Sequence, residues 1–347
     1  MINRLSLHIL LALALASCVK STMDPVAPEP MVFSAVASHS TKGIITTTNY
    51  PIDEPFVVEA VHYDDDTGLS GGDAFMTRET VQYDIDNGLW RTEDDYFWPI
   101  DGRIRFYAGS PLIPEVSVTR ENGVTANWDI SSGENTQTDL CFAEVDEDCT
   151  AHSASVPIIF SHALSQVCIK ARTIKHYSYS RSIDNLIQAN IITVVLDSVK
   201  IGGIVSKGRF TQKPLGWLLE KDIKSEYPVF SSKKGQELGC DRYDNPILYR
   251  LNNMLLIPQT LSEDAYIQEW HHIVVRTSVT DKDTGQIISD TTYELPKSSV
   301  IYLADYCEAW NLDYKYTYRL AVGLDSPMLS MAVTDWTETR EIILEDQ

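Results

Sequence analysis

The chain has 347 residues and carries 49 acidic against 28 basic side chains, which gives a formal net charge of -21. This excess of negative charge opposes binding to nucleic acid or to an anionic membrane surface. After a leader of ordinary size, the remaining length is sufficient for two domains.

The first residues have the pattern of a bacterial secretory signal. An apolar run over residues 5–16 follows Arg4 and falls short of the ~20 residues that a membrane-spanning helix needs. Residues 15–18 read Leu-Ala-Ser-Cys, which is typical of a lipobox. We therefore predict that residues 1–17 form a lipoprotein signal peptide, that Cys18 is lipidated, and that the chain is exported. The alternative is an ordinary signal peptide with an incidental cysteine.

The chain that follows the signal begins with a tether and a short strand. Residues 18–30 are rich in polar residues and proline, which favours an extended linker. Met31–Ala37 is a β-prone run that ends in a polar stretch. A second β-prone run, Gly43–Thr48, begins directly after Lys42. We therefore expect an N-terminal strand that a short segment separates from the next one.

From Pro51 onward, β-prone segments alternate with Asn-Gly and Asp-Gly turns, which supply the positive φ values of tight hairpins. The pattern predicts an antiparallel sandwich over residues 31–152. The strands expected in it are 56–61, 96–99, 103–107 and 139–145, with turns at 86–88, 101–102 and 122–123.

A second block of β-prone segments begins near Val156 and predicts another antiparallel sandwich over residues 153–347. Ile191–Val199 is mostly apolar on both faces, which indicates a central strand covered on two sides. Lys315–Val322 alternates, so its apolar face should pack inward. Ser299–Trp310 is the candidate for a short connector helix. Further strands are expected at 156–160, 167–174, 255–258, 273–279 and 331–336.

The six cysteines less Cys18 leave five, an odd number with no C-x-x-C pair. At least one thiol must therefore stay unpaired. In an oxidising compartment a bridge between Cys141 and Cys149 could span the acidic turn between them, although the spacing does not require it. The spacing gives little support to a zinc site. The five residues are Cys141, Cys149, Cys168, Cys240 and Cys307.

No set of residues has the pattern of an active site. Gly68–Gly72 matches G-x-S-x-G around Ser70, but an acidic loop precedes it and no helical pattern follows, so a hairpin loop is favoured over a nucleophile elbow. Two pairs of acidic residues lack the loop pattern and terminal Glu of a calcium-binding hand and read as turn formers. These pairs are Asp64 with Asp66 and Asp281 with Asp283.

Histidine and tryptophan residues also favour structural roles. His271 and His272 are adjacent on a predicted strand, so their rings point to opposite faces and cannot share a metal. His162 lies beside Phe160 and Leu164, which indicates a core or hydrogen-bonding histidine. Four tryptophans could form a platform for sugar rings, but packing in the core is favoured. They are Trp90, Trp98, Trp128 and Trp310.

Several short sequence motifs, which occur in a fixed order after a lipobox, resemble those of the fimbrillin family, the lipoprotein-precursor subunits of type V pili. The resemblance implies two transthyretin-like β-sandwich domains, transport to the outer membrane as a surface lipoprotein, and polymerisation after a protease removes the first strand. In chain order, the motifs are Tyr96-Phe97-Trp98-Pro99, Arg105-Phe106-Tyr107-Ala108, Asp139-Leu140, residues 160–167 (Phe-Ser-His-Ala-Leu-Ser-Gln-Val), Leu256-Ile257-Pro258-Gln259, Tyr316-x-Tyr318 and Val333-Thr334-Asp335-Trp336.

The same resemblance predicts how the chain would mature. Family members are usually cut after an arginine that follows the first strand. This chain has Lys42 before Gly43 instead. A second possibility is therefore a subunit that is not cut there and keeps its lipid, as an anchor does. Residues 337–347 are the candidate donor strand. If Met31–Ala37 fills a sheet edge, its removal exposes a groove that favours a strand from another subunit.

The function that follows is a structural subunit of a cell-surface pilus that supports adhesion. Its expected partners are other pilus subunits, together with the outer membrane through the lipid and a surface ligand on a host or bacterial cell. No cofactor and no catalytic residue are expected. The alternative is a surface lipoprotein that binds glycans through exposed tryptophans without polymerising, and a hydrolase that uses Ser70 comes third.

Overall fold

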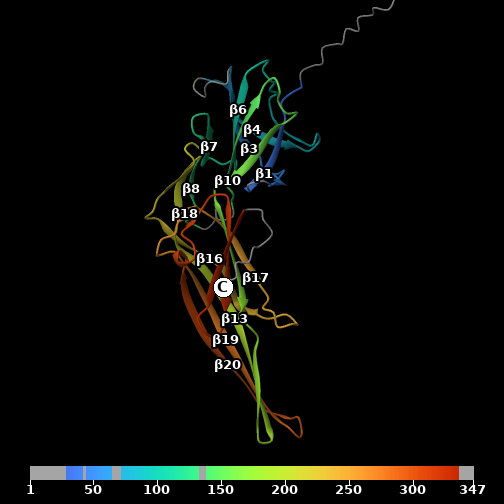
Figure 1. The fold of residues 1–347 in the computed structure, drawn as a ribbon, viewed down its shortest axis with the longest axis vertical. Helices are drawn as coiled ribbons and strands as arrows, with labels where there is room; N and C mark the ends of the chain where they lie inside the picture. Colours follow the sequence, from blue (N-terminus) through green and yellow to red (C-terminus); the bar gives the residue numbers. More distant parts are fainter. Residues whose placement is uncertain (1–28, 42–43, 65–71, 133–137, 336–347) are drawn as a thin grey trace, which may run out of the picture.

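The computed structural model describes residues 29–41, 44–64, 72–132 and 138–335, and this part of the chain is built from strands (Figure 1). Its one helical segment is a single 3-10 turn, η2 (Leu303–Asp305). Within the same residues, no helix is long and apolar enough to cross a membrane. The prediction of an all-β fold is therefore confirmed.

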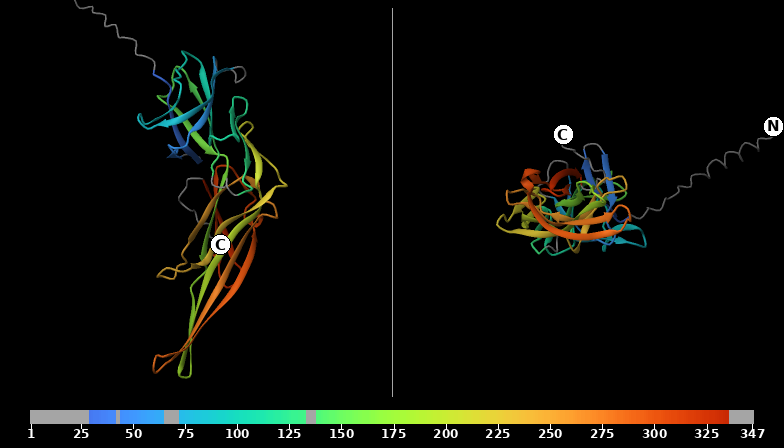
Figure 2. Two further views of the ribbon diagram at one scale, coloured as in Figure 1. Left: turned by 180° about the vertical axis from the view of Figure 1, so that it is seen from behind. Right: turned by 90° about the horizontal axis from the view of Figure 1, so that it is seen from below.

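The molecule is elongated. Its first strands lie at one end, and three long strands extend together to the other end (Figures 1 and 2). These are β13 (Leu186–Val205), β19 (Tyr266–Asp281) and β20 (Ile287–Tyr302), in which β19 pairs with both of its neighbours. The far ends of these strands extend beyond the body of the molecule.

The first sheet has eight strands in the order β10-β9-β6-β3-β4-β5-β1-β2, and β10 also pairs with β1. This extra pairing joins the first strand of the order to the next-to-last, so seven of the strands form a closed ring and β2 lies outside it. The strands are β1 (Phe33–Thr41), β2 (Ile44–Asn49), β3 (Phe56–Tyr63), β4 (Asp73–Asp84), β5 (Leu89–Thr92), β6 (Arg103–Ser110), β9 (Cys141–Asp148) and β10 (Val156–His162).

The other strands form four smaller sheets. The sheet of the long strands adds β12 (Tyr177–Ile183) and β16 (Lys224–Leu238), which pair with the first and second parts of β13 along the edge opposite β19. A second sheet has the order β17 (Tyr249–Leu256), β11 (Ser165–Thr173), β22 (Tyr314–Val322), β23 (Met328–Asp335). A third has the order β15 (Gly216–Leu219), β14 (Lys207–Thr211), β8 (Gly123–Asp129), β7 (Val116–Thr119), and β18 (Gln259–Thr260) pairs with β21 (Ala309–Trp310).

Two apolar cores hold these sheets. One lies inside the closed ring and is lined by β1, β3, β6 and β10. The other continues from β7 and β8 into the strands that follow residue 163. Because β8 pairs with β14, the hairpin β7–β8 of the first half is part of the second core. The two halves of the sequence therefore share one core at their junction.

This arrangement corrects the expected start of the second block near Val156. The strand β10 completes the first sheet, because Val156, Ile158 and Phe160 are buried in the first core, where β10 pairs with β1. A register of this kind joins residues more than a hundred positions apart. Local pattern alone could not place it.

Two further expectations differ from the structure. Tyr96–Pro99 is not a strand; Tyr96 and Trp98 instead pack against the first core from an irregular segment, in which Pro99 has no N–H for a ladder. Ser299–Trp310 is not a connector helix beyond the turn η2. Pairing of Ile301 with Ile267 keeps the chain extended to the end of β20, which overrides the local preference.

The strand predictions for the second half are largely confirmed. In β22 the residues Tyr316, Tyr318, Leu320 and Val322 are all buried, as the alternation predicted. The segment Ile191–Val199 is central in its sheet, but only its second part is covered on both faces. Ile191 is 49% exposed, because this end of β13 belongs to the part that extends beyond the body.

A disulfide between Cys141 and Cys149 is excluded by the fold. Cys141 is the first residue of β9 and Cys149 directly follows its last, so the eight residue steps from one to the other span about 26 Å of extended chain. A disulfide needs Cα atoms within about 7 Å of each other. Both thiols are buried, and all five cysteines of the described residues are unbridged.

Glycine is required where β13 passes the segment before β19. Gly203 has a φ of +69°, and a Cβ atom there would lie 1.8 Å from the backbone oxygen of Asp264. Gly285 has a nearly equal φ of +67°, but a Cβ atom there would meet nothing within 4 Å. A comparison of the two positions therefore distinguishes the cost of a positive φ from the cost of a steric clash.

We expect Gly203→Ala to destabilise the protein more than Gly285→Ala. The positive φ alone costs about 1–2 kcal/mol for an alanine, whereas the clash at Gly203 also forces the two backbones apart. Thermal unfolding followed by circular dichroism measures the difference. Equal losses for the two variants would show that the contact between Gly203 and Asp264 is not tight.

Candidate functional site

The strand β1 closes the first sheet. Along one edge Phe33–Ala37 pairs in parallel with Val156–Phe160 of β10. Along the other edge Phe33 pairs with Trp90 of β5, and Val36–Thr41 pairs with β2. Without β1, both β5 and β10 would present an unpaired edge to solvent.

The inner face of residues 31–35 is buried in the aromatic core. Met31, Phe33 and Ala35 are 3%, 2% and 8% exposed, whereas Ser34 is exposed. The Phe33 ring meets the Phe106 ring edge to face, with centroids 6.0 Å apart. This alternation is typical of a half-buried strand.

Backbone hydrogen bonds fix the same segment at its start. The Met31 N–H donates to the Tyr96 carbonyl at 2.6 Å, and the Val156 N–H donates to the Val32 carbonyl at 2.8 Å. Burial of two large apolar side chains contributes about 3–6 kcal/mol, to which each main-chain hydrogen bond adds about 1 kcal/mol. This sum is comparable with the stability of a whole domain.

The aromatic core beneath β1 also includes Tyr50. Tyr50, which follows β2, lies with its ring centroid 4.8 Å from that of Phe160 and 5.6 Å from that of Trp90. Its hydroxyl forms a 2.5 Å hydrogen bond with the Ser110 hydroxyl. Burial raises the pKa of Tyr50, with a further contribution from nearby acidic groups. Tyr50 therefore anchors the chain that follows β2 in the aromatic core, and its backbone N–H also donates to the Ala35 carbonyl of β1.

Several of the residues singled out in the sequence lie outside the described residues. They are Cys18, Lys42, Gly43, Ser70 and the segment 337–347. The proposed lipidation, the cut after Lys42 and the donor strand therefore stay predictions.

The two adjacent histidines have separate partners, as predicted. His271 is buried with its Nδ1 atom 2.7 Å from a Glu269 carboxylate oxygen. His272 has its Nδ1 atom 2.9 Å from a carboxylate oxygen of Asp197 on the neighbouring strand. Among the acidic pairs, Asp281 accepts hydrogen bonds from the backbone N–H groups of Asp283 and Thr284, which is a turn-forming role.

The tryptophans do not form a platform for sugar rings. Trp90, Trp128 and Trp310 are core residues that are 5%, 2% and 1% exposed. Trp98 is half-buried and stacks on the ring of His152, with centroids 4.0 Å apart. The preference for core packing is therefore confirmed, and the glycan hypothesis loses the residues on which it rested.

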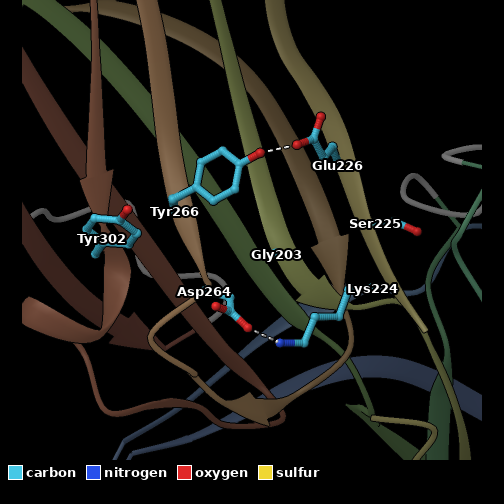
Figure 3. Close-up of a pocket in the computed structure, with 7 residues that line it drawn as sticks. All are labelled: Gly203, Lys224, Ser225, Glu226, Asp264, Tyr266 and Tyr302. Atoms are coloured by element: carbon cyan, nitrogen blue, oxygen red, sulfur yellow. Dashed lines mark hydrogen bonds and ion pairs between the residues drawn. The ribbon is translucent and has the colours of Figure 1, made fainter. Parts of the chain in front are cut away.

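An open pocket between β13, β16 and β19 was not predicted from the sequence (Figure 3). Its charged groups bind one another: Lys224 forms a 2.7 Å ion pair with Asp264, and the Tyr266 hydroxyl donates to Glu226. Glu226 also pairs with Lys200 at 2.8 Å. A polar ligand would have to displace these internal contacts, so the pocket does not by itself indicate a function.

The fold and this site define an all-β protein whose first strand closes a sheet. A model of the fimbrillin-like family matches residues 61–336, which is most of the chain. The protein therefore belongs to the fimbrillin-like family, and the resemblance found in the sequence is confirmed. No protein with a curated description matches it.

The chain is also similar to several solved structures. A fimbrial protein from Bacteroides vulgatus is similar over 81% of this chain and 93% of its own, with 17% identity and a TM-score of 0.53, which shows a shared fold. A candidate cell adhesion protein from Bacteroides uniformis covers 89% and 98% with 13% identity and a TM-score of 0.47. The fimbrial anchor protein Mfa2 from Porphyromonas gingivalis covers 89% and 98% with 12% identity and a TM-score of 0.31.

The contribution of β1 to stability can be measured on the intact chain. We expect Phe33→Ala to lower the free energy of unfolding by about 3–5 kcal/mol, because it removes a buried aromatic ring. The matched control Ser34→Ala, on the exposed face, should change it by less than about 0.5 kcal/mol. Urea unfolding followed by tryptophan fluorescence compares the two. A Phe33→Ala variant as stable as the control would mean that β1 is not held in the core.

Proposed function

We propose that the protein is a structural subunit of a cell-surface fimbria, exported as a lipoprotein and assembled by exchange of its first strand. The observation that carries the proposal is the position of β1. This strand closes the first sheet, and only residues 42–43 separate it from β2 along the chain. Membership of the fimbrillin-like family supports a role at the cell surface.

Removal of β1 would leave a site suited to a strand. The edge of β10 would lose its partner along Val156–Phe160, and the places of Met31 and Phe33 in the aromatic core would be empty. An extended segment with alternate apolar residues satisfies both requirements at once, since its backbone restores the ladder and its side chains fill the core. A neighbouring subunit would supply that segment.

The rest of the molecule is built to stay folded during the exchange. The second core does not include β1, and it extends from β7 and β8 through the second half of the chain. In this proposal residues 337–347 of one subunit fill the groove of the next. Cys18 holds the precursor at the outer membrane until cleavage, and a subunit that escapes cleavage stays there as an anchor.

Cleavage and locking together test the mechanism. The full chain carries Cys18→Ser to prevent lipidation and a protease recognition sequence between Lys42 and Gly43. After cleavage, we expect the N-terminal peptide to leave and the protein to form oligomers in size-exclusion chromatography, because the open edge takes a strand from another copy.

A disulfide lock provides the control. Val36 and Ile159 are paired neighbours outside the buried face, and Ile159 is 41% exposed, so Val36→Cys with Ile159→Cys can bridge β1 to β10. The cleaved, oxidised double variant should stay monomeric and oligomerise once it is reduced, and Val36→Cys alone should behave as the unlocked protein. Oligomers of the locked form, or a folded monomer that persists after the peptide has left, would contradict the proposal.

A further inference from the structure

Three side chains that metals commonly bind meet at the junction of β9 and β10. Cys141 and His162 are directly paired across the two strands, and Asp139 lies two residues before Cys141. The His162 Nδ1 atom is 2.5 Å from Asp139 Oδ2 and 3.6 Å from Cys141 Sγ. A sulfur, an imidazole nitrogen and a carboxylate oxygen thus lie within 4.8 Å of one another.

The local environment is rich in negative charge. Burial raises the pKa of the Cys141 thiol well above its ordinary value, and the carboxylates of Asp139, Glu54 and Asp313 raise it further. The other carboxylate oxygen of Asp139, Oδ1, is buried and accepts no hydrogen bond within the described residues. A site with these acidic groups around it favours a bound cation.

The geometry does not suit a catalytic relay. In a Cys-His-Asp relay the two nitrogens of the imidazole face different partners. Here one nitrogen, His162 Nδ1, faces both the thiol and the carboxylate, and the thiol is buried. Convergence of three donor atoms on one point is instead the arrangement that a metal ion requires.

We propose that Asp139, Cys141 and His162 bind one zinc-class divalent cation through Oδ2, Sγ and Nδ1. Thiolate, imidazole and carboxylate together are a donor set that Zn²⁺ accepts in tetrahedral geometry, with a fourth position left for water. Ligand bonds of ~2.1 Å would place Nδ1 and Oδ2 about 3.4 Å apart, so these two atoms separate by roughly 1 Å on binding. The thiol proton is released to solvent.

The site would fasten the first sheet beside the strand that β1 pairs with. His162 is the last residue of β10, and Cys141 is the first residue of β9. A bound ion would therefore join the two strands by a bridge that does not depend on β1. It would stabilise the ring whether or not the first strand is in place, so this inference is independent of the proposed function.

Metal binding to the untagged full chain, freed of metal by a chelator, tests the proposal. We expect one equivalent of Zn²⁺ per chain by calorimetry, and a rise in the thermal unfolding midpoint. With Co²⁺ as a spectroscopic probe, the thiolate ligand should give strong near-ultraviolet absorption. Cys141→Ser should abolish this absorption, and Asp139→Asn and His162→Gln should each weaken Zn²⁺ binding by about 100-fold or more.

Cys149→Ser is the matched control, because Cys149 is also buried and adjoins β9 but lies at the other end of the strand. It should bind both ions as the unaltered chain does. Circular dichroism establishes that each variant is folded. Failure of the unaltered chain to bind a stoichiometric amount of Zn²⁺, or cobalt-thiolate absorption that persists in Cys141→Ser, would overturn the proposal.

Discussion

The structure depends on one strand pairing. The parallel ladder between β1 and β10 closes the first sheet into a ring around its aromatic core. The parallel pairing of β1 with β10 joins residues more than a hundred positions apart in the sequence, whereas β1 pairs antiparallel with the next strand along the chain, β2. Removal of β1 would open the ring between β5 and β10.

The second core explains why such a strand can be separable. The second core is a continuous apolar interior that includes residues of β7, β8 and most strands from β11 onward, and the hairpin β7–β8 joins the two halves of the sequence through β14. This second core contains no residue of β1. A fimbrial subunit that exchanges its first strand needs this distribution, since the acceptor must keep its shape while its groove is empty.

Much of this organisation could be predicted from the sequence because it is local. Alternation in Lys315–Val322, and the Asn-Gly and Asp-Gly turns, give faces and hairpins directly; Gly88, Gly102 and Gly123 all have positive φ. What could not be predicted depends on register between distant strands. The placement of β10 in the first sheet is one case.

The cluster of Asp139, Cys141 and His162 is another such case, because it exists only once His162 is known to lie opposite Cys141. The sequence presents His162 beside apolar neighbours, which correctly indicated a buried, hydrogen-bonded ring but not its partners. The irregular path of Tyr96–Pro99 was missed for the opposite reason. Its aromatic residues suit a strand, but they pack inward from a segment that has no place in a ladder.

Hydrogen exchange measured by mass spectrometry tests the central claim most directly. The amides of β10 and β5 are followed in the intact chain, in the chain freshly cleaved before Gly43, and after addition of a synthetic peptide of residues 31–41. The account predicts strong protection in the first state, loss of protection in the second while β11 and β22 stay protected, and recovery in the third. Protection of β10 that is indifferent to the presence of β1 would contradict it.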